Sequence, residues 1–150
     1  MTSTDRIEKQ ILLKAPRSRV WRAITDSREF GAWFGVSIDG SFVVGQTVKG
    51  KITAPGYTHL TMSVLVDRIE PERLFSYRWH PYAIDPKVDY SSEPMTLVEF
   101  RLEEEGGGTR LHIVESGFDR VPAHRRDEAF RMNEGGWQEQ LANVRKHVEV

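Results

Sequence analysis

Glu115 is the ionisable residue whose position in the sequence most favours chemistry in a closed site. It follows Leu111 and Ile113 at two-residue spacing, so the three side chains share one face of an extended strand. If that face is buried, desolvation raises the pKa of the carboxyl, and Glu115 becomes a candidate acid, base or hydrogen-bond partner. If the strand frays at its end, the carboxyl reaches water instead. Both interpretations remain open.

A second set of polar groups lies in the stretch from Tyr77 to His80. Tyr77 and Trp79 share a strand face, so a phenol and an indole N–H would point toward the same cavity as Glu115. His80 and His59 are expected at the rim of such a cavity. General acid–base catalysis requires only one or two groups beside a substrate, so Glu115, Tyr77 and His80 are the candidates for proton transfer.

The sequence lacks the patterns of metal, thiol and nucleotide chemistry. It contains no cysteine, and its five histidines are scattered without the spacing of metal ligands. No Gly-x-Ser-x-Gly motif is present, and the run Gly106–Gly108 lies between two predicted strands and not before a helix. We therefore assign no catalytic residue and expect no metal or cofactor.

Hydrophobic periodicity predicts one strand, two short helices, six further strands and a long final helix. The first strand covers residues 7–13, and the helices cover residues 16–25 and 27–33. Very short connections at residues 70–72 and 106–108 indicate hairpins, hence an antiparallel meander. The further strands are predicted at residues 36–38 (or 41–44), 47–53, 60–70, 73–80, 95–103 and 109–115.

The last three predicted strands before the final helix, residues 73–80, 95–103 and 109–115, present one apolar face. The helix, over residues 122–147, has a single apolar stripe that must cover this face. Gly135 and Gly136 weaken this helix, so we expect close backbone approach or a local bend beside Trp137.

A helix about 10 Å across leaves space under a curved sheet. Candidates to line that cavity are Trp33, Phe75, Tyr77, Trp79, Val98, Phe100, Ile113, Glu115, Phe130, Glu134 and Trp137. The alternative is that these aromatic side chains simply fill the core.

Composition restricts the class of protein. At 150 residues, with 39% hydrophobic and 29% charged residues, the chain is expected to form a single domain over residues 1–150. A formal net charge of -1 with interspersed signs argues against nucleic acid as a partner, and no apolar run is long enough for membrane insertion. A charged N-terminus and the absence of cysteine favour the cytoplasm. We expect a monomer or weak dimer, with residues 81–94 forming a lid or a mobile loop.

Four stretches of the sequence resemble the family named for the activator of the heat-shock chaperone ATPase (AHSA-like). They are Ala15-Pro16 with Val20-Trp21, Thr25-Asp26 and Trp33; Glu70-Pro71 with Leu74, Phe75, Tyr77 and Trp79; Gly108-Thr109 with Leu111, Ile113 and Ser116-Gly117-Phe118; and Gly136-Trp137 with Leu141. The order of elements resembles the wider START-like, or SRPBCC, superfamily of lipid-binding domains and polyketide cyclases.

The resemblance implies an α+β helix-grip fold, a curved antiparallel sheet of six or seven strands with a long C-terminal helix across its concave face. It implies three functions. The first is binding of a small hydrophobic molecule in an internal cavity. The second is a cyclase- or hydrolase-like enzyme acting on an aromatic or lipid-like substrate. The third, a stress-response co-chaperone, is less favoured, because better-known activators join this domain to a second one that contributes much of the chaperone contact.

Overall fold

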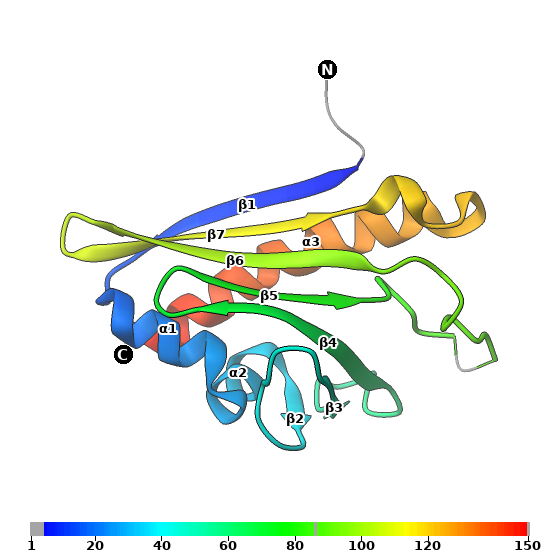
Figure 1. The fold of residues 1–150 in the computed structure, drawn as a ribbon, viewed down its shortest axis with the longest axis horizontal. Coiled ribbons are helices and arrows are strands. Elements are labelled where there is room, and N and C mark those ends of the chain that lie inside the picture. Colours follow the sequence, from blue (N-terminus) through cyan, green and yellow to red (C-terminus); the bar gives the residue numbers. More distant parts are fainter. Residues whose placement is uncertain (1–4, 86, 150) are drawn as a thin grey trace.

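A single curved sheet of seven antiparallel strands forms the body of the protein (Figure 1). The computed structural model describes residues 5–85 and 87–149. The strand order is β1-β7-β6-β5-β4-β3-β2, so each strand from β2 to β6 pairs with the next one along the chain, and β1 pairs with β7 at the far edge. The elements are β1 (Arg6–Leu13), α1 (Arg17–Thr25), α2 (Ser27–Phe34), β2 (Val36–Ile38), β3 (Thr47–Ile52), β4 (Thr61–Glu70), β5 (Leu74–Trp79), β6 (Thr96–Glu105), β7 (Gly108–Ser116), a 3-10 turn (Phe118–Arg120) and α3 (Ala123–Val148).

The predicted meander and helix-grip arrangement are confirmed. Of the two positions considered for the second strand, Val36–Ile38 is right and residues 41–44 are wrong as a strand. The latter form part of a loop that turns Phe42 into the core, where its ring meets Phe30 at 5.5 Å and Phe75 at 4.9 Å between centroids. Hydrophobic periodicity alone cannot distinguish a short strand from a loop that buries a single side chain.

The concave face carries the apolar side chains that the alternation predicts. Phe75 pairs with Phe100, which pairs with Ile113, and all three are buried. The rings of Phe75 and Phe100 stack with centroids 5.9 Å apart. Helix α3 crosses this side of the sheet (Figure 1), with its own buried residues spaced along one stripe. Those residues are Ala129, Trp137, Leu141, Val144 and Val148.

The two glycines in the middle of α3 do not bring another backbone close to the helix. The helix is continuous from Ala123 to Val148, and a Cβ added at Gly135 or Gly136 would have no neighbour within 4 Å. The expected close backbone approach at these glycines is therefore wrong, and the alternative, a local bend beside Trp137, stays a prediction. Gly135 is exposed, and Gly136 borders an open space next to Trp137. The absence of a side chain at Gly136 leaves the space beside Trp137 unfilled, and no other backbone approaches this glycine.

Helices α1 and α2 are joined by a residue that caps the second of them. The Asp26 carboxylate accepts hydrogen bonds from the backbone N–H groups of Arg28 and Glu29, which satisfies two donors at the start of α2. The helix ends at Gly35, whose φ of 95° lies in the left-handed region that favours glycine. These caps fix where α2 ends and thereby place Phe34 beside the sheet.

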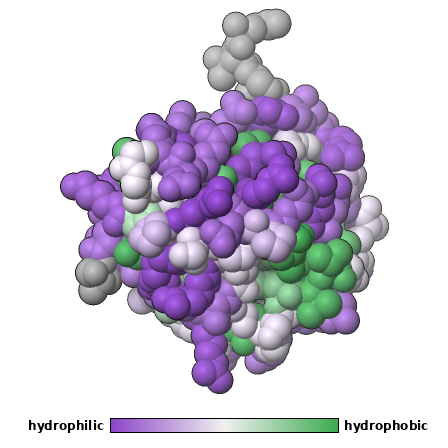
Figure 2. All heavy atoms as spheres, turned by 60° about the vertical axis from the view of Figure 1, so that its left-hand side comes forward, coloured by the Kyte–Doolittle hydropathy of each residue, from purple (hydrophilic) through white to green (hydrophobic). Residues whose placement is uncertain are grey.

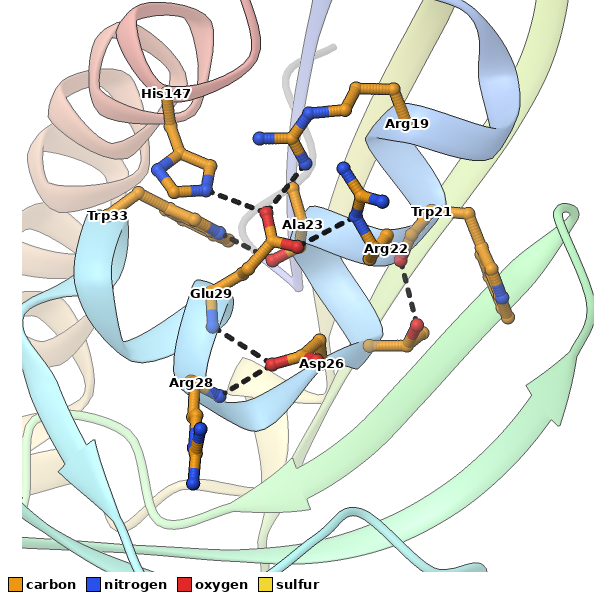
Figure 3. A network of polar contacts seen from close by, with 10 residues as sticks. Arg19, Trp21, Arg22, Ala23, Asp26, Arg28, Glu29, Trp33 and His147 are labelled. Atoms are coloured by element: carbon orange, nitrogen blue, oxygen red, sulfur yellow. Dashed lines mark hydrogen bonds and ion pairs between the residues drawn. The ribbon is translucent and has the colours of Figure 1, made fainter.

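Glu29 lies at the centre of the polar network that ties the three helices together (Figure 3). Its carboxylate accepts hydrogen bonds from Arg19 at 2.6 Å and His147 at 2.9 Å, and it forms an ion pair with Arg22 at 2.9 Å. Burial alone would raise the pKa of Glu29, but these hydrogen bonds and the arginine charges outweigh it and lower the pKa. The ionised carboxylate thus joins α1 and α2 to the last turn of α3.

The face seen in Figure 2 is predominantly hydrophilic, and its largest hydrophobic area lies at the lower right of the view. The large hydrophobic side chains that are exposed are Leu12, Val43, Val44, Tyr57, Val88 and Met132. Within residues 5–85 and 87–149, no helix is long and apolar enough to cross a membrane.

The Glu29 network predicts a pH-dependent contribution to stability. Replacing Glu29 by Gln should lower the free energy of unfolding at pH 7 by about 1 to 3 kcal/mol, since hydrogen bonds to a charged group are lost. Because the folded pKa lies below the ordinary 4.5, this contribution is present above pH 4.5 and is lost as the pH falls through the folded value. Urea unfolding of both proteins from pH 3 to pH 7 measures it. Glu8→Gln, which removes an exposed pair with Arg6, is the control and should change stability by less than about 0.5 kcal/mol. A pH-independent difference for Glu29→Gln would contradict the assignment.

Candidate functional site

The carboxylate of Glu115 is completely buried at the end of β7, where four side chains donate hydrogen bonds to it. Trp79 Nε1 and Thr96 Oγ1 donate to Oε2 at 2.7 and 2.6 Å, and Trp137 Nε1 donates to Oε1 at 2.8 Å. Asn133 Nδ2 lies 3.0 Å from Oε1 and 3.2 Å from Oε2. The donors come from β5, β6 and α3, so one carboxylate joins the helix to three adjacent strands.

Burial and hydrogen bonding act in opposite directions on Glu115. Burial raises the pKa of its carboxyl, and the hydrogen bonds from Thr96, Trp79, Trp137 and Asn133 offset part of that rise. The indole N–H groups of Trp79 and Trp137 can only donate hydrogen bonds, so each oxygen of Glu115 must act as an acceptor. The inward orientation that the alternation suggested for Glu115 is confirmed, and the frayed alternative is wrong.

The Tyr77 hydroxyl is a second buried polar group in this region. It is buried next to Trp79, whose ring centroid lies 5.3 Å from that of Tyr77, and has no hydrogen-bond partner among the described residues. Burial and the negative charge of Glu115 raise the pKa of Tyr77 well above its ordinary value of 10.0. The phenol is therefore held in its neutral form.

A groove of about 270 Å³ opens at the end of the sheet where β4 begins and β5 ends. Its walls come from the end of α2, the strands β3 to β5, the loop after β5, and α3. The lining residues are Phe34, Ile52, Leu60, Thr61, Met62, Ser63, Trp79, His80, Tyr82, Ala83, Ile84 and Asn133. A second hollow of about 170 Å³ shares Phe34, Trp79 and Asn133 with the groove and is completed by Gly136, Trp137 and Gln140. Because they share three walls, the two spaces are neighbours. We call the first the outer groove and the second, which lies against the Glu115 partner Trp137, the inner hollow; both are open to the surface.

The loop that borders the outer groove is attached to α3 by Arg125. The guanidinium donates to Glu93 Oε1 at 2.8 Å and to the carbonyl oxygen of Pro81 at 2.6 Å, and it lies 4.8 Å from the ring centroid of Tyr90. His80 Nε2 is 3.0 Å from the carbonyl oxygen of Glu93. Both ends of the loop are thus held, and Tyr82, Ala83 and Ile84 between them face the groove.

The structure divides the candidate lining residues into four groups. Trp79 and Trp137 border the groove or hollow, and Glu115 lies directly behind them. Phe75, Tyr77, Val98, Phe100 and Ile113 fill the core beneath α3 and border neither space. Trp33 donates its indole N–H to the carbonyl oxygen of Ala23 and lines a separate groove with His147. Phe130 packs on Phe118 with centroids 5.1 Å apart, and Glu134 is exposed.

Sequence reasoning missed two of the groups that hold Glu115. Asn133 lies four residues before Trp137 and thus on the same stripe of α3, a position where a polar residue needs a partner. Thr96 is in phase with Val98 and Phe100 on the inward face of β6. The helical spacing of Asn133 and the strand alternation of Thr96 could therefore have identified both residues from the sequence. The residues contributed by β3, by the start of β4 and by the loop after β5 have no comparable pattern.

The described residues offer no metal site: no group of three or more His, Asp or Glu side chains lies close enough together to hold an ion. What the site provides is an apolar groove, two indole walls, an amide and a carboxylate behind them. This arrangement can bind and orient a small molecule.

A sheet of this curvature covered by one long C-terminal helix defines the helix-grip class of protein. The family model described as activator of Hsp90 ATPase homolog 1-like protein matches residues 14–149. The chain belongs to that family. A search of the curated proteins found no match.

Solved structures of low sequence identity share the fold. A protein from Mesorhizobium loti is 23% identical with a TM-score of 0.76, over 96% of each chain. The Aha1 dimer from Colwellia psychrerythraea is 19% identical with a TM-score of 0.72, over 97% of this chain and 96% of that one. A protein in the dynemicin biosynthetic locus is 20% identical with a TM-score of 0.74, and the match covers 97% of this chain and 48% of that protein. The chain therefore spans about half the length of this last relative.

The hydrogen bond from Thr96 predicts a specific change in the Glu115 titration. Thr96→Val removes one donor at nearly constant volume, so the pKa of Glu115, already above the ordinary 4.5, should rise further. The ¹³C resonance of the Glu115 carboxyl, followed by NMR through a pH titration, measures this. Thr109→Val is the matched control, since Thr109 is equally buried but donates to the carbonyl oxygen of Ala15 and not to Glu115. An unchanged or lower Glu115 pKa in Thr96→Val would contradict the assignment.

Proposed function

We propose that the protein binds a small, largely apolar molecule in the outer groove and inner hollow. The observation that carries this proposal is their position: both border Trp79 and Asn133, whose polar groups are held by the buried carboxylate of Glu115. The walls of the binding site are thus fixed before a ligand arrives, which reduces the entropy lost on binding.

The chemistry of the lining supports the same function. Phe34, Ile52, Leu60, Met62 and Ile84 supply apolar surface, and five residues with polar groups lie among them. Small-molecule sites typically combine apolar walls with a few polar groups that orient the ligand. Here those groups are the side chains of Thr61, Ser63, His80, Tyr82 and Asn133.

Residues 81–94 are proposed as the gate of this site. Three of them border the groove, and the contacts of Arg125 with Pro81 and Glu93 hold the two ends of the segment against α3. Residues 85 and 87–89 of the segment are exposed, so local opening there would cost little free energy.

Acid–base catalysis has less support. Of the three candidates for proton transfer, only His80 borders the groove. Tyr77 and Glu115 are buried behind the wall, and both oxygens of Glu115 already accept hydrogen bonds. The likenesses to the Aha1 dimer and to the protein of the dynemicin locus carry the fold alone, because they are 20% identical or less. Neither chaperone activation nor biosynthetic chemistry is proposed from them.

Filling the inner hollow should abolish binding without loss of fold. We expect a screen of apolar compounds by thermal unfolding to find ligands that raise the Tm by several degrees at concentrations about 100-fold above Kd. Gly136→Leu should remove this shift, because the new side chain occupies the hollow beside Trp137. Gly135→Leu is the control: it is one position away, exposed, and gives a similar gain in helix propensity.

Two outcomes would contradict the proposal. One is that no apolar compound shifts the Tm of the wild-type protein. The other is that ligands bind Gly136→Leu and Gly135→Leu equally well, which would place the binding site elsewhere.

A further inference from the structure

The carboxylate of Glu115 has only neutral partners. Its four hydrogen-bond donors are two indoles, a hydroxyl and an amide, and none of the ion pairs among residues 5–85 and 87–149 includes it. Buried carboxylates are usually paired with a cation, because hydrogen bonds from neutral groups do not cancel the net charge. Both carboxyl oxygens of Glu115 accept hydrogen bonds, two of them from indoles that can only donate, and this geometry favours the ionised form. The negative charge of that form has no cationic partner among the described residues.

The potential of this charge extends into the inner hollow. Three of the four donors, Trp79, Asn133 and Trp137, are also walls of the hollow, so the carboxylate lies one side chain behind its surface. Among the described residues, no lysine or arginine borders either the hollow or the outer groove. Because the Asn133 amide nitrogen is directed to Glu115, its oxygen remains as an acceptor for a ligand in either space.

Three aromatic rings border the same hollow and pack against one another. The ring centroid of Phe34 lies 6.3 Å from that of Trp79 and 6.1 Å from that of Trp137, and the two tryptophan rings are 5.8 Å apart. The faces of tryptophan and phenylalanine rings attract cations, and aromatic walls are a recurrent way of binding quaternary ammonium groups. Gly136 leaves the hollow open on the α3 side, which provides room for such a group.

We propose that the inner hollow binds the positively charged head of an organic ammonium compound whose apolar body lies in the outer groove. This inference rests on the proposed function and specifies its ligand class. The buried carboxylate supplies long-range attraction, the aromatic rings supply the contact surface, and the Asn133 oxygen accepts a hydrogen bond where the head group carries an N–H. A carboxylate head would be repelled by Glu115 and would meet no lysine or arginine there.

Three ligands of equal chain length test the head-group preference. Binding of octyltrimethylammonium, octanol and octanoate to the wild-type protein is measured by isothermal titration calorimetry at pH 7. We expect the ammonium compound to bind at least about fivefold more tightly than the alcohol, and octanoate to bind most weakly. If the alcohol or octanoate binds as tightly as the ammonium compound, the ammonium site is refuted and an apolar binding function stands. If none of the three binds, both proposals are refuted.

A substitution in the wall separates the cation site from general apolar contact. Phe34→Leu keeps an apolar side chain but removes one ring face, so it should weaken octyltrimethylammonium about fivefold and leave octanol nearly unchanged. Phe130→Leu is the control, since Phe130 is a partly buried aromatic residue that packs on Phe118 outside both spaces. Equal weakening of both ligands by Phe34→Leu would overturn the cation–π contribution.

Discussion

The buried carboxylate of Glu115 is the constraint on which the arrangement of the site depends. It is the point where β5, β6, β7 and α3 meet through side-chain hydrogen bonds. Removing such an acceptor would leave several buried donors unpaired, each at a cost of about 1 to 3 kcal/mol. The carboxylate therefore fixes the rotamers of Trp79, Asn133 and Trp137 and, through them, the walls of the groove and hollow. Stability and ligand selection are linked through one residue.

Core packing explains why the open space lies at the end of the sheet. Under α3 the concavity is filled by Phe30, Phe75 and Phe100, whose rings stack or meet edge to face. Toward the start of β4 the rings of Trp79 and Trp137 continue this packing, but Gly136, which has no side chain, leaves a space beside them. The outer groove and inner hollow are what remains uncovered. A single α-helix cannot cover the whole width of a curved sheet.

Most of the fold and part of the site were predictable from the sequence. Alternation placed Phe75, Phe100 and Ile113 on one buried face and directed Glu115 inward, because a strand has only two faces. Which of the aromatic residues would border a space was not predictable, since an aromatic stripe has the same pattern whether it fills a core or lines a cavity. Loop residues such as Tyr82 and Ile84 have no periodicity at all, so their approach to the groove depends on tertiary contacts of Arg125.

The four tryptophan indole N–H resonances provide the most direct test that the site holds a ligand where we place it. Trp79 and Trp137 flank the hollow, whereas Trp33 lies in a separate groove and Trp21 is on α1. When ¹⁵N-labelled protein is titrated with an apolar ligand, we expect the signals of Trp79 and Trp137 to shift together while those of Trp21 and Trp33 stay in place. Shifts confined to Trp21 or Trp33 would contradict it.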